Sequence, residues 1–266
     1  MLRNFVEGRA VISSKWVLVL VGIIAFSGGP VSGQTLLQDS FDGYADQAAF
    51  QAVWTTIGAT PSGTLTSSQS VSAPNSINYA TAAQRNERSF AESGLPNIAT
   101  GNIVRFSFDF FDSNSGLAPY RQYANLQDGA APSTSGQLIS MGLNNNLTSA
   151  AEGGNFYMAR ILGHNTNAYF KLNDNPALLR STGWHNLAVE ISDADYRFFV
   201  DGALAETIPN TLTLRSYDVV RLGSGLSSTA EAFFDNVSVQ AIPEPGTLAL
   251  VSVAAVGLLS FRRRQK

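Results

Sequence analysis

Cysteine is absent from the 266 residues, so the chain has no disulfide, no thiolate metal site and no cysteine nucleophile. Histidine is nearly absent, and His164 and His185 leave little for a His-based zinc site. Charged residues make up 14% of the chain, against roughly 25% in an average globular protein. The formal net charge of −3 excludes a basic nucleic-acid-binding protein as the default class. The 23 glycines, with many serines, threonines and asparagines, favour strands and turns over a helical bundle.

Residues 1–33 have the pattern of a secretory signal peptide. Basic residues near the start are followed by an uninterrupted apolar run over 16–26. This run has the length of a signal-peptide core and is short for a membrane span. Small residues up to Gly33 predict cleavage after that position, which leaves Gln34 as the new N-terminus. The alternative is an uncleaved N-terminal anchor.

Residues 243–266 form a second terminal module. It consists of a Pro-Glu-Pro-Gly start, an apolar stretch over 247–261 and a basic end. Fifteen residues make about 22 Å of helix, which is less than the roughly 30 Å hydrocarbon core of a bilayer. The alternative is an ordinary C-terminal membrane anchor. The residues that define the module are Pro243, Glu244, Pro245, Arg262, Arg263 and Arg264.

The order and spacing of these three parts resemble the PEP-CTERM protein-sorting signal of Gram-negative bacteria. The resemblance implies recognition by an exosortase, a membrane transpeptidase thought to cut at the Pro-Glu-Pro region. It also implies a bacterium that makes extracellular polysaccharide, and membrane contact during sorting. A signal peptide, removed by signal peptidase, is what such a pathway requires at the other end.

The body between these modules, residues 34–242, is acidic. It holds 10 Lys and Arg against 18 Asp and Glu, a formal charge of −8. Such a surface resists nucleic acid and anionic lipid and is compatible with neutral polysaccharide or calcium. No fixed-period repeat and no charge-rich linker divides the body, so we predict one domain.

Alternation of apolar and polar residues predicts several strands in the body. It is clearest over 103–111, 184–191, 196–200 and 233–239. In the last segment the alternation places Phe233, Asp235 and Val237 on one face. Asp201-Gly202 is a tight-turn signal between two strands. The segment 46–54 is the one plausible short helix, so the sequence predicts an all-β sandwich or barrel.

One hairpin narrows the fold class. Gly183-Trp184-His185, followed by an alternating strand and a second strand that closes in Val200-Asp201-Gly202, resembles the central hairpin of laminin-G and concanavalin A-like jelly rolls. Phe234-Asp235-Asn236-Val237 resembles the last strand of such domains. The resemblance implies two stacked antiparallel sheets of about 12 to 14 strands, flanked here by an N-terminal signal helix and a C-terminal hydrophobic helix.

The sequence predicts no catalytic residues. Glycosidases of the resembled fold usually carry Glu-x-Asp-x-x-Glu on one strand, which places the carboxylates on one sheet face, and no glutamate of the body begins that motif. Asp109 and Asp112 are interpreted as solvated residues at a strand end. A Ser-His-Asp triad would have to use His164 or His185. We interpret His185, which falls on the apolar face of its strand, as a hydrogen-bonded core histidine.

A structural calcium is the one cofactor that we expect. In the resembled family the first and last strands are neighbours and often hold calcium, which implies Asp39, Asp42 and Asp235 as ligands. Calcium takes six to eight oxygen ligands, and a buried carboxylate needs a cation or hydrogen-bond donors. The alternative is a carboxylate capped by backbone N–H groups.

Aromatic side chains with polar neighbours are candidates for sugar contact. They are Tyr120, Tyr123, Tyr157 and Tyr169. The alternative for each is ordinary packing within the sandwich.

These observations predict an exported protein of the cell surface or extracellular matrix, with a transient or retained C-terminal membrane anchor. The expected function is a non-catalytic carbohydrate-binding or adhesion module that contacts extracellular polysaccharide and no nucleic acid. The alternatives are a structural biofilm-matrix protein without a small ligand, and a divergent glycoside hydrolase or lyase.

Overall fold

The computed structural model describes residues 33–80, 82–90, 102–113, 121–130, 133–144, 155–164, 168–212, 216–228 and 230–243. The chain separates into two units, Met1–Val31 and Ser32–Lys266, and all described residues belong to the second. The predicted signal helix and the predicted C-terminal hydrophobic helix lie outside the described residues. No helix within them is long and apolar enough to cross a membrane.

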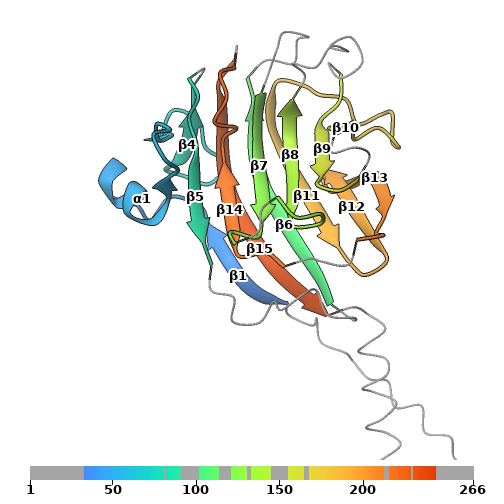
Figure 1. Cartoon of the computed structure of the whole chain (residues 1–266). Coiled ribbons are helices and arrows are strands. Elements are labelled where there is room, and N and C mark those ends of the chain that lie inside the picture. Colours follow the sequence, from blue (N-terminus) through green and yellow to red (C-terminus); the bar gives the residue numbers. More distant parts are fainter. Residues whose placement is uncertain are drawn as a thin grey trace, which may run out of the picture. The chain divides into compact units, whose positions relative to one another are not determined.

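The body forms two antiparallel sheets stacked face to face (Figure 1). Sheet A is eight-stranded. Its strands in spatial order are β13 (Ala203–Pro209), β12 (Asp195–Val200), β11 (Gly183–Ile191), β6 (Asn102–Asp112), β15 (Ala232–Pro243), β4 (Ser76–Tyr79) and β3 (Thr64–Thr66), with β1 (Gln34–Asp39) also paired to β15.

Sheet B is seven-stranded and faces the viewer in Figure 1. Its strands in spatial order are β10 (Phe170–Lys171), β9 (Met158–Ile161), β8 (Leu138–Asn144), β7 (Arg121–Gln127), β14 (Val219–Leu222), β5 (Asn86–Ser89) and β2 (Thr55–Thr56). The all-β two-sheet prediction is confirmed, with 15 strands in the described residues where the resemblance implied about 12 to 14.

The core lies between the sheets because each strand turns alternate side chains inward. Phe106, Phe108 and Phe110 of β6 are fully buried. Ile139 and Met141 of β8, in the other sheet, are also fully buried and belong to the same hydrophobic cluster. The period-two pattern that predicted strands therefore also identifies the residues that hold the two layers together.

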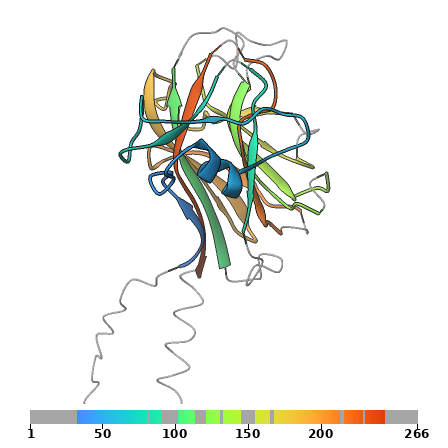
Figure 2. The ribbon, with the colours of Figure 1, turned by 90° about the vertical axis from the view of Figure 1, so that its left-hand side faces the viewer.

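The helix α1 (Gln47–Val53) closes one side of the sandwich, where β2 and β3 end the two sheets (Figure 2). Asp46 is the N-cap, and its side chain accepts a hydrogen bond of 2.8 Å from the Ala49 N–H. Phe50 on the inner face is fully buried. The helix predicted over 46–54 is confirmed. Its N-cap and its one buried aromatic side chain stabilise these two turns.

The last strand differs from its predicted pattern. The register between β15 and β6 shifts between Asp235 and Ser238, and Asn236 has a φ of 47°. This bulge turns Phe234 and Val237 into the core and leaves Phe233 packing against Phe111 on the outer side. The prediction that Phe233, Asp235 and Val237 share one face is wrong, because a bulge reverses alternation beyond it.

Candidate functional site

The outer face of sheet B carries a row of polar side chains in exact cross-strand register. Consecutive neighbours along the row are Glu87, Arg221, Asn125, Ser140 and Arg160. Each alternates along its strand with a core residue, so all five point away from the interior. Four strand spacings of about 4.8 Å give the row a length of about 19 Å.

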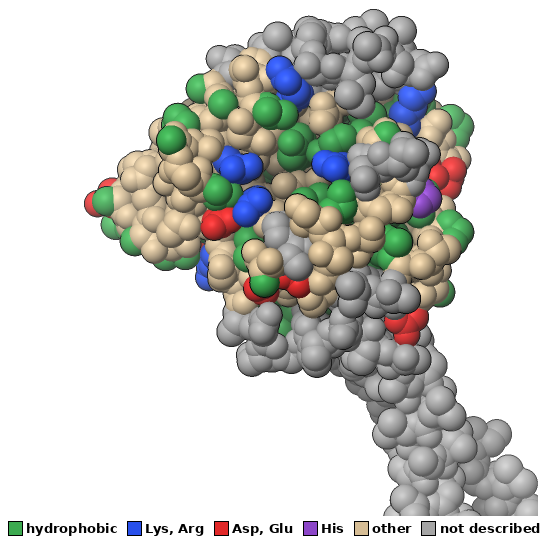
Figure 3. Space-filling view, viewed as in Figure 1, with side chains coloured by type: hydrophobic (Ala, Val, Ile, Leu, Met, Phe, Trp, Pro, Cys, Tyr) green, Lys and Arg blue, Asp and Glu red, His purple; other side chains and the backbone are tan. Residues whose placement is uncertain are grey.

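Basic side chains gather on this face. Half of the ten Lys and Arg residues of the body lie here (Arg85, Arg121, Arg160, Lys171 and Arg221), on or next to the strands of sheet B. Figure 3 shows Lys and Arg side chains over the middle and upper part of the face, with acidic side chains mainly lower down and at its borders. Arg221 forms an ion pair of 2.9 Å with Glu87. Within the described residues no ion pair is found for the other four.

Buried polar atoms on the same face also lack partners. Among the described residues, no hydrogen bond reaches Nε of Arg85, Arg121 or Arg160, or either amide atom of Gln127. Burial and the neighbouring Arg221 cation lower the pKa of Arg85 below its ordinary value. Buried polar groups in folded proteins are almost always hydrogen-bonded, so this concentration of unpartnered donors distinguishes the face from the rest of the sandwich.

Cations elsewhere in the described residues are neutralised within the fold. Every other described arginine forms an ion pair, as follows: Arg88 with Asp39, Arg105 and Arg197 with Glu190, and Arg180 with Asp112. The contrast means that the excess positive charge on sheet B is a local property, although the body as a whole is acidic.

Two of the predicted tyrosines meet on this face. The rings of Tyr123 on β7 and Tyr169 beside β10 lie 5.5 Å apart, and the Arg160 guanidinium lies 6.0 Å from the Tyr169 ring centre. Gly142 is the cross-strand neighbour of Tyr123, and a Cβ at Gly142 would lie 2.5 Å from the Gln122 carbonyl oxygen and 2.7 Å from Cα of Tyr123. Burial is the main cause that raises the pKa of Tyr169, with Tyr123 adding to it. The Tyr169 hydroxyl is therefore a neutral hydrogen-bonding group rather than a base.

The other two tyrosines have different outcomes. Tyr120 lies outside the described residues. Tyr157 is fully buried, with its ring 6.2 Å from that of Phe110, so it belongs to the interior.

The arginines of the outer face of sheet B and Gln127 were not among the predicted site residues. Alternation in Arg121-Gln-Tyr-Ala-Asn-Leu-Gln127 places four polar side chains on one face, and this signal could have identified them.

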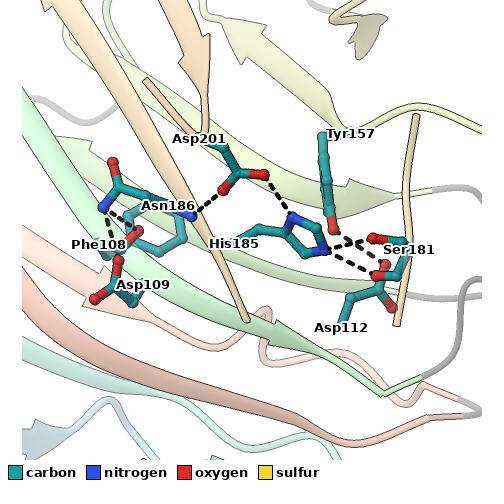
Figure 4. Close-up of polar contacts among 8 residues, drawn as sticks. All are labelled: Phe108, Asp109, Asp112, Tyr157, Ser181, His185, Asn186 and Asp201. Atoms are coloured by element: carbon teal, nitrogen blue, oxygen red, sulfur yellow. Dashed lines mark hydrogen bonds and ion pairs between the residues drawn. The ribbon is translucent and has the colours of Figure 1, made fainter. Parts of the chain in front are cut away.

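A second polar cluster lies at the rim, where β11 begins (Figure 4). His185 Nδ1 is 2.8 Å from Asp201 Oδ2, and Nε2 is 3.0 Å from both Oγ and the carbonyl oxygen of Ser181. Asp201 Oδ1 accepts a hydrogen bond of 2.8 Å from the Asn186 N–H. Asp201 and Gly202 have φ values of 51° and 78° and form the predicted tight turn. The cluster thus ties this turn to the start of β11.

Behind the His185 ring, which packs 5.4 Å from the ring of Tyr157, lies a buried ion pair. Arg180 Nε and Nη2 donate to the two carboxylate oxygens of Asp112 at 3.0 and 3.3 Å. The Tyr157 hydroxyl donates to the same carboxylate at 3.4 Å (Figure 4). Both charged side chains are fully buried. The interpretation of Asp112 as a solvated residue is wrong, because Arg180 reaches it from a loop 68 positions away in the sequence.

The three carboxylates predicted to bind calcium each face hydrogen-bond donors. Asp39 accepts from the Tyr44 hydroxyl at 2.6 Å and the Trp54 indole at 2.9 Å, and it pairs with Arg88. Asp42 accepts from the Asn75 N–H at 2.9 Å. The described residues include no group of three or more His, Asp or Glu that could hold a metal ion. An arginine in contact with Asp39 does not fit a cation site there.

Asp235 is a carboxylate capped by backbone N–H groups, the alternative to calcium binding that the sequence left open. Its oxygens accept from the backbone N–H groups of Val71, Ser72 and Asn236 at 2.8, 3.0 and 2.7 Å. Burial raises the pKa of Asp235, and these hydrogen bonds offset part of that rise. Calcium binding stays a prediction, and the geometry favours a capped carboxylate.

The two ends of the folded body lie side by side in sheet A. Gln34, the predicted new N-terminus, is the first residue of β1 and pairs with Ala241 of β15. Pro243, the first residue of the Pro-Glu-Pro motif, is the last residue of β15 and pairs with Asn102. Both predicted cleavage regions therefore adjoin the sheet without a spacer. Glu244, Pro245 and the terminal arginines lie outside the described residues.

Comparison with protein families identifies the C-terminal module. A family model described as the PEP-CTERM protein-sorting motif matches residues 241–264. The chain therefore carries a sorting signal of the kind that an exosortase recognises, which marks it for export and sorting to the cell surface. The domain boundaries at 33 and 243 stay predictions. No curated protein sequence matches the chain.

Solved structures resemble the body in fold alone. The carbohydrate esterase vb_24B_21 of the Shiga toxin-encoding bacteriophage phi24B matches with a TM-score of 0.56 at 12% identity, covering 80% of this chain and 100% of that one. Cellulose induced protein Cip1 matches with a TM-score of 0.51 at 11% identity, covering 76% and 96%. The body is thus a two-sheet sandwich with structural neighbours of jelly-roll type.

Proposed function

We propose that the chain is an exosortase-sorted protein of the cell surface or extracellular matrix whose sandwich binds polysaccharide without catalysing a reaction. The observation that carries the proposal is the outer face of sheet B. It combines partly exposed arginines that have no carboxylate partner among the described residues with a pair of tyrosines. Sugar hydroxyls can accept hydrogen bonds from the guanidinium N–H groups of such arginines.

Two further observations support this proposal. The sorting motif directs the chain to the compartment in which extracellular polysaccharide is found. The name of one structural neighbour, a carbohydrate esterase, agrees with a carbohydrate partner.

Glycan-array binding by the full chain in a nonionic detergent tests the function. We expect binding to a defined set of polysaccharides, weakened by Tyr123→Ala. Phe199→Ala, which removes a partly exposed aromatic from the outer side of sheet A, is the matched control and should bind normally. Failure of every glycan to bind, with loss of matrix cohesion in a deletion strain, would select a purely structural role instead.

The sorting step has its own test. Replacing Pro243, Glu244 and Pro245 with alanines should leave an uncleaved, membrane-retained form that is detectable by size in membrane fractions. Unchanged processing and release would remove exosortase sorting from the proposal while leaving the binding test intact.

A second candidate function, hydrolysis, has one observation in its favour. Ser181, His185 and Asp201 make the two contacts of a Ser-His-Asp triad, at 3.0 and 2.8 Å. Against it, the carbonyl oxygen of Ser181 itself lies 3.0 Å from Nε2, so the serine hydroxyl is not the sole partner of that nitrogen. A fluorophosphonate probe should leave the protein unlabelled. Labelling that Ser181→Ala abolishes would replace the binding proposal with a hydrolase.

A further inference from the structure

The charge on the outer face of sheet B indicates what kind of polysaccharide it takes. Neutral sugars need hydrogen-bond donors and acceptors but no net charge. The face instead carries Arg85, Arg121, Arg160 and Lys171 without a carboxylate partner among the described residues, and only Glu87 opposes Arg221. Uncompensated cations on one face repel one another, and an anionic ligand would relieve that repulsion.

We propose that the ligand bound at this face is an acidic polysaccharide, a chain of sugars that carries carboxylate groups. This inference rests on the proposed polysaccharide-binding function and assigns its ligand class. Guanidinium groups suit carboxylates because their planar N–H fork matches the two oxygens. The net charge of −8 on the body does not oppose this, since charges beyond a Debye length of about 8 Å are screened at physiological salt.

The spacing of charge favours a moderately charged chain. Along the central row, Asn125 and Ser140 separate Arg221 from Arg160 by three strand spacings, about 14 Å. Charges placed so far apart, with Glu87 at the end of the row, match a polymer with separated carboxylates. A nucleic acid carries a phosphate at every nucleotide and would bring excess negative charge against Glu87.

The tyrosine pair also argues against nucleic acid. Proteins that bind single strands offer open aromatic faces on which bases stack. Here the Tyr123 and Tyr169 rings are tilted at 46° to each other, and the Arg160 guanidinium covers the Tyr169 ring. The Tyr169 hydroxyl lies within hydrogen-bonding reach of Tyr123, Ser140 and Asn144. A polar cluster of this kind suits hydrogen bonding to a sugar chain better than stacking of bases.

The experiment compares charged and neutral versions of the same polymer. The full chain in a nonionic detergent is titrated with hyaluronate, which carries a carboxylate on every second sugar, and with the same polymer after complete methyl esterification. We expect binding to the acidic form, loss of binding on esterification, and affinity that falls as salt rises. Single-stranded RNA serves as a densely charged competitor and should bind more weakly.

Variants assign the interaction to this face. Arg160→Gln and Arg121→Gln should each weaken binding about threefold to tenfold. The matched control is Arg197→Gln, which removes a cation from the outer side of sheet A, where it is paired with Glu190. This control should bind as the unaltered chain does. Circular dichroism of all three variants checks that the fold is retained.

The outcomes separate the two proposals. Equal binding of esterified and acidic polymers, without an effect of Arg160→Gln, overturns the acidic ligand and leaves polysaccharide binding standing. Tighter binding of RNA than of the acidic polysaccharide also overturns it. If neither these polymers nor any neutral glycan binds, the polysaccharide-binding function itself fails and the inference fails with it.

Discussion

The buried pair of Asp112 and Arg180 allows a sharp test of how the rim of the sandwich is held together. Both side chains are fully buried, and two N–H donors of Arg180 meet the two oxygens of Asp112. Arg180→Met keeps an apolar side chain of similar length but removes both donors and the charge. Of the two contacts described above for the Asp112 carboxylate, with Arg180 and with Tyr157, only the hydrogen bond of 3.4 Å from the Tyr157 hydroxyl is kept.

The expected cost follows from burial. Removing one partner of a buried ion pair destabilises proteins by about 3 to 5 kcal/mol, because the other charge stays buried without compensation. Domains are stable by only about 5 to 15 kcal/mol, so this single change should remove a large fraction of the free energy of unfolding. Arg105→Met is the matched control. It breaks the pair with Glu190 on the surface, where the side chains are 28% and 19% exposed, and should cost at most about 1 kcal/mol.

Urea unfolding of the full chain in detergent, followed by tryptophan fluorescence, measures both changes. The double variant Asp112→Leu/Arg180→Met removes the buried carboxylate together with its cation and should recover most of the lost stability. Two results would refute the reasoning: Arg180→Met costing no more than Arg105→Met, or the double variant being no more stable than the single one.

Three further predictions concern other positions. Gly142 and Gly183 have φ values of +137° and +136°, but only at Gly142 would a Cβ meet backbone, at 2.5 Å; Gly142→Ala should therefore lower the melting temperature far more than Gly183→Ala. Because burial raises the pKa of Asp235 above its ordinary 3.8, the folded state holds this proton more tightly than the unfolded chain does. The contribution of Asp235 to the free energy of unfolding should thus fall as pH rises above 3.8, and Asp235→Ala should reduce this pH dependence in urea titrations. Calcium added to the unaltered chain tests the metal prediction in the same assay. A flexible Gly-Ser segment inserted before Pro243 should speed exosortase cleavage in a pulse-chase experiment, since that residue is paired in β15, and an unchanged rate would show that the sheet does not limit access.

Local patterns in the sequence determined the local structure. Asp46 followed by an apolar face predicted α1, and the alternation around Phe106 predicted β6, because capping and period-two burial depend on near neighbours in the chain. The Asp201-Gly202 turn required positive φ, which glycine and aspartate accept. The Pro-Glu-Pro signal is likewise read in a short stretch of sequence.

Other features depend on residues far apart in the chain. The sequence predicts Asp112 as a solvated residue at a strand end, but in the fold it forms a buried ion pair with Arg180. The bulge at Asn236 places Phe233 on the opposite side of the sheet from Val237. A bulge is a property of strand pairing, so alternation along one strand cannot reveal it.

The acidic composition of the body, the C-terminal sorting motif and the all-β class could be read from the sequence. Only the tertiary structure brought Arg85, Arg121, Arg160 and Arg221 onto one face, because they come from segments spread over more than 130 positions and meet through antiparallel pairing of five strands. Composition sums charge over the whole surface, whereas a binding site depends on where sheet register places each charge.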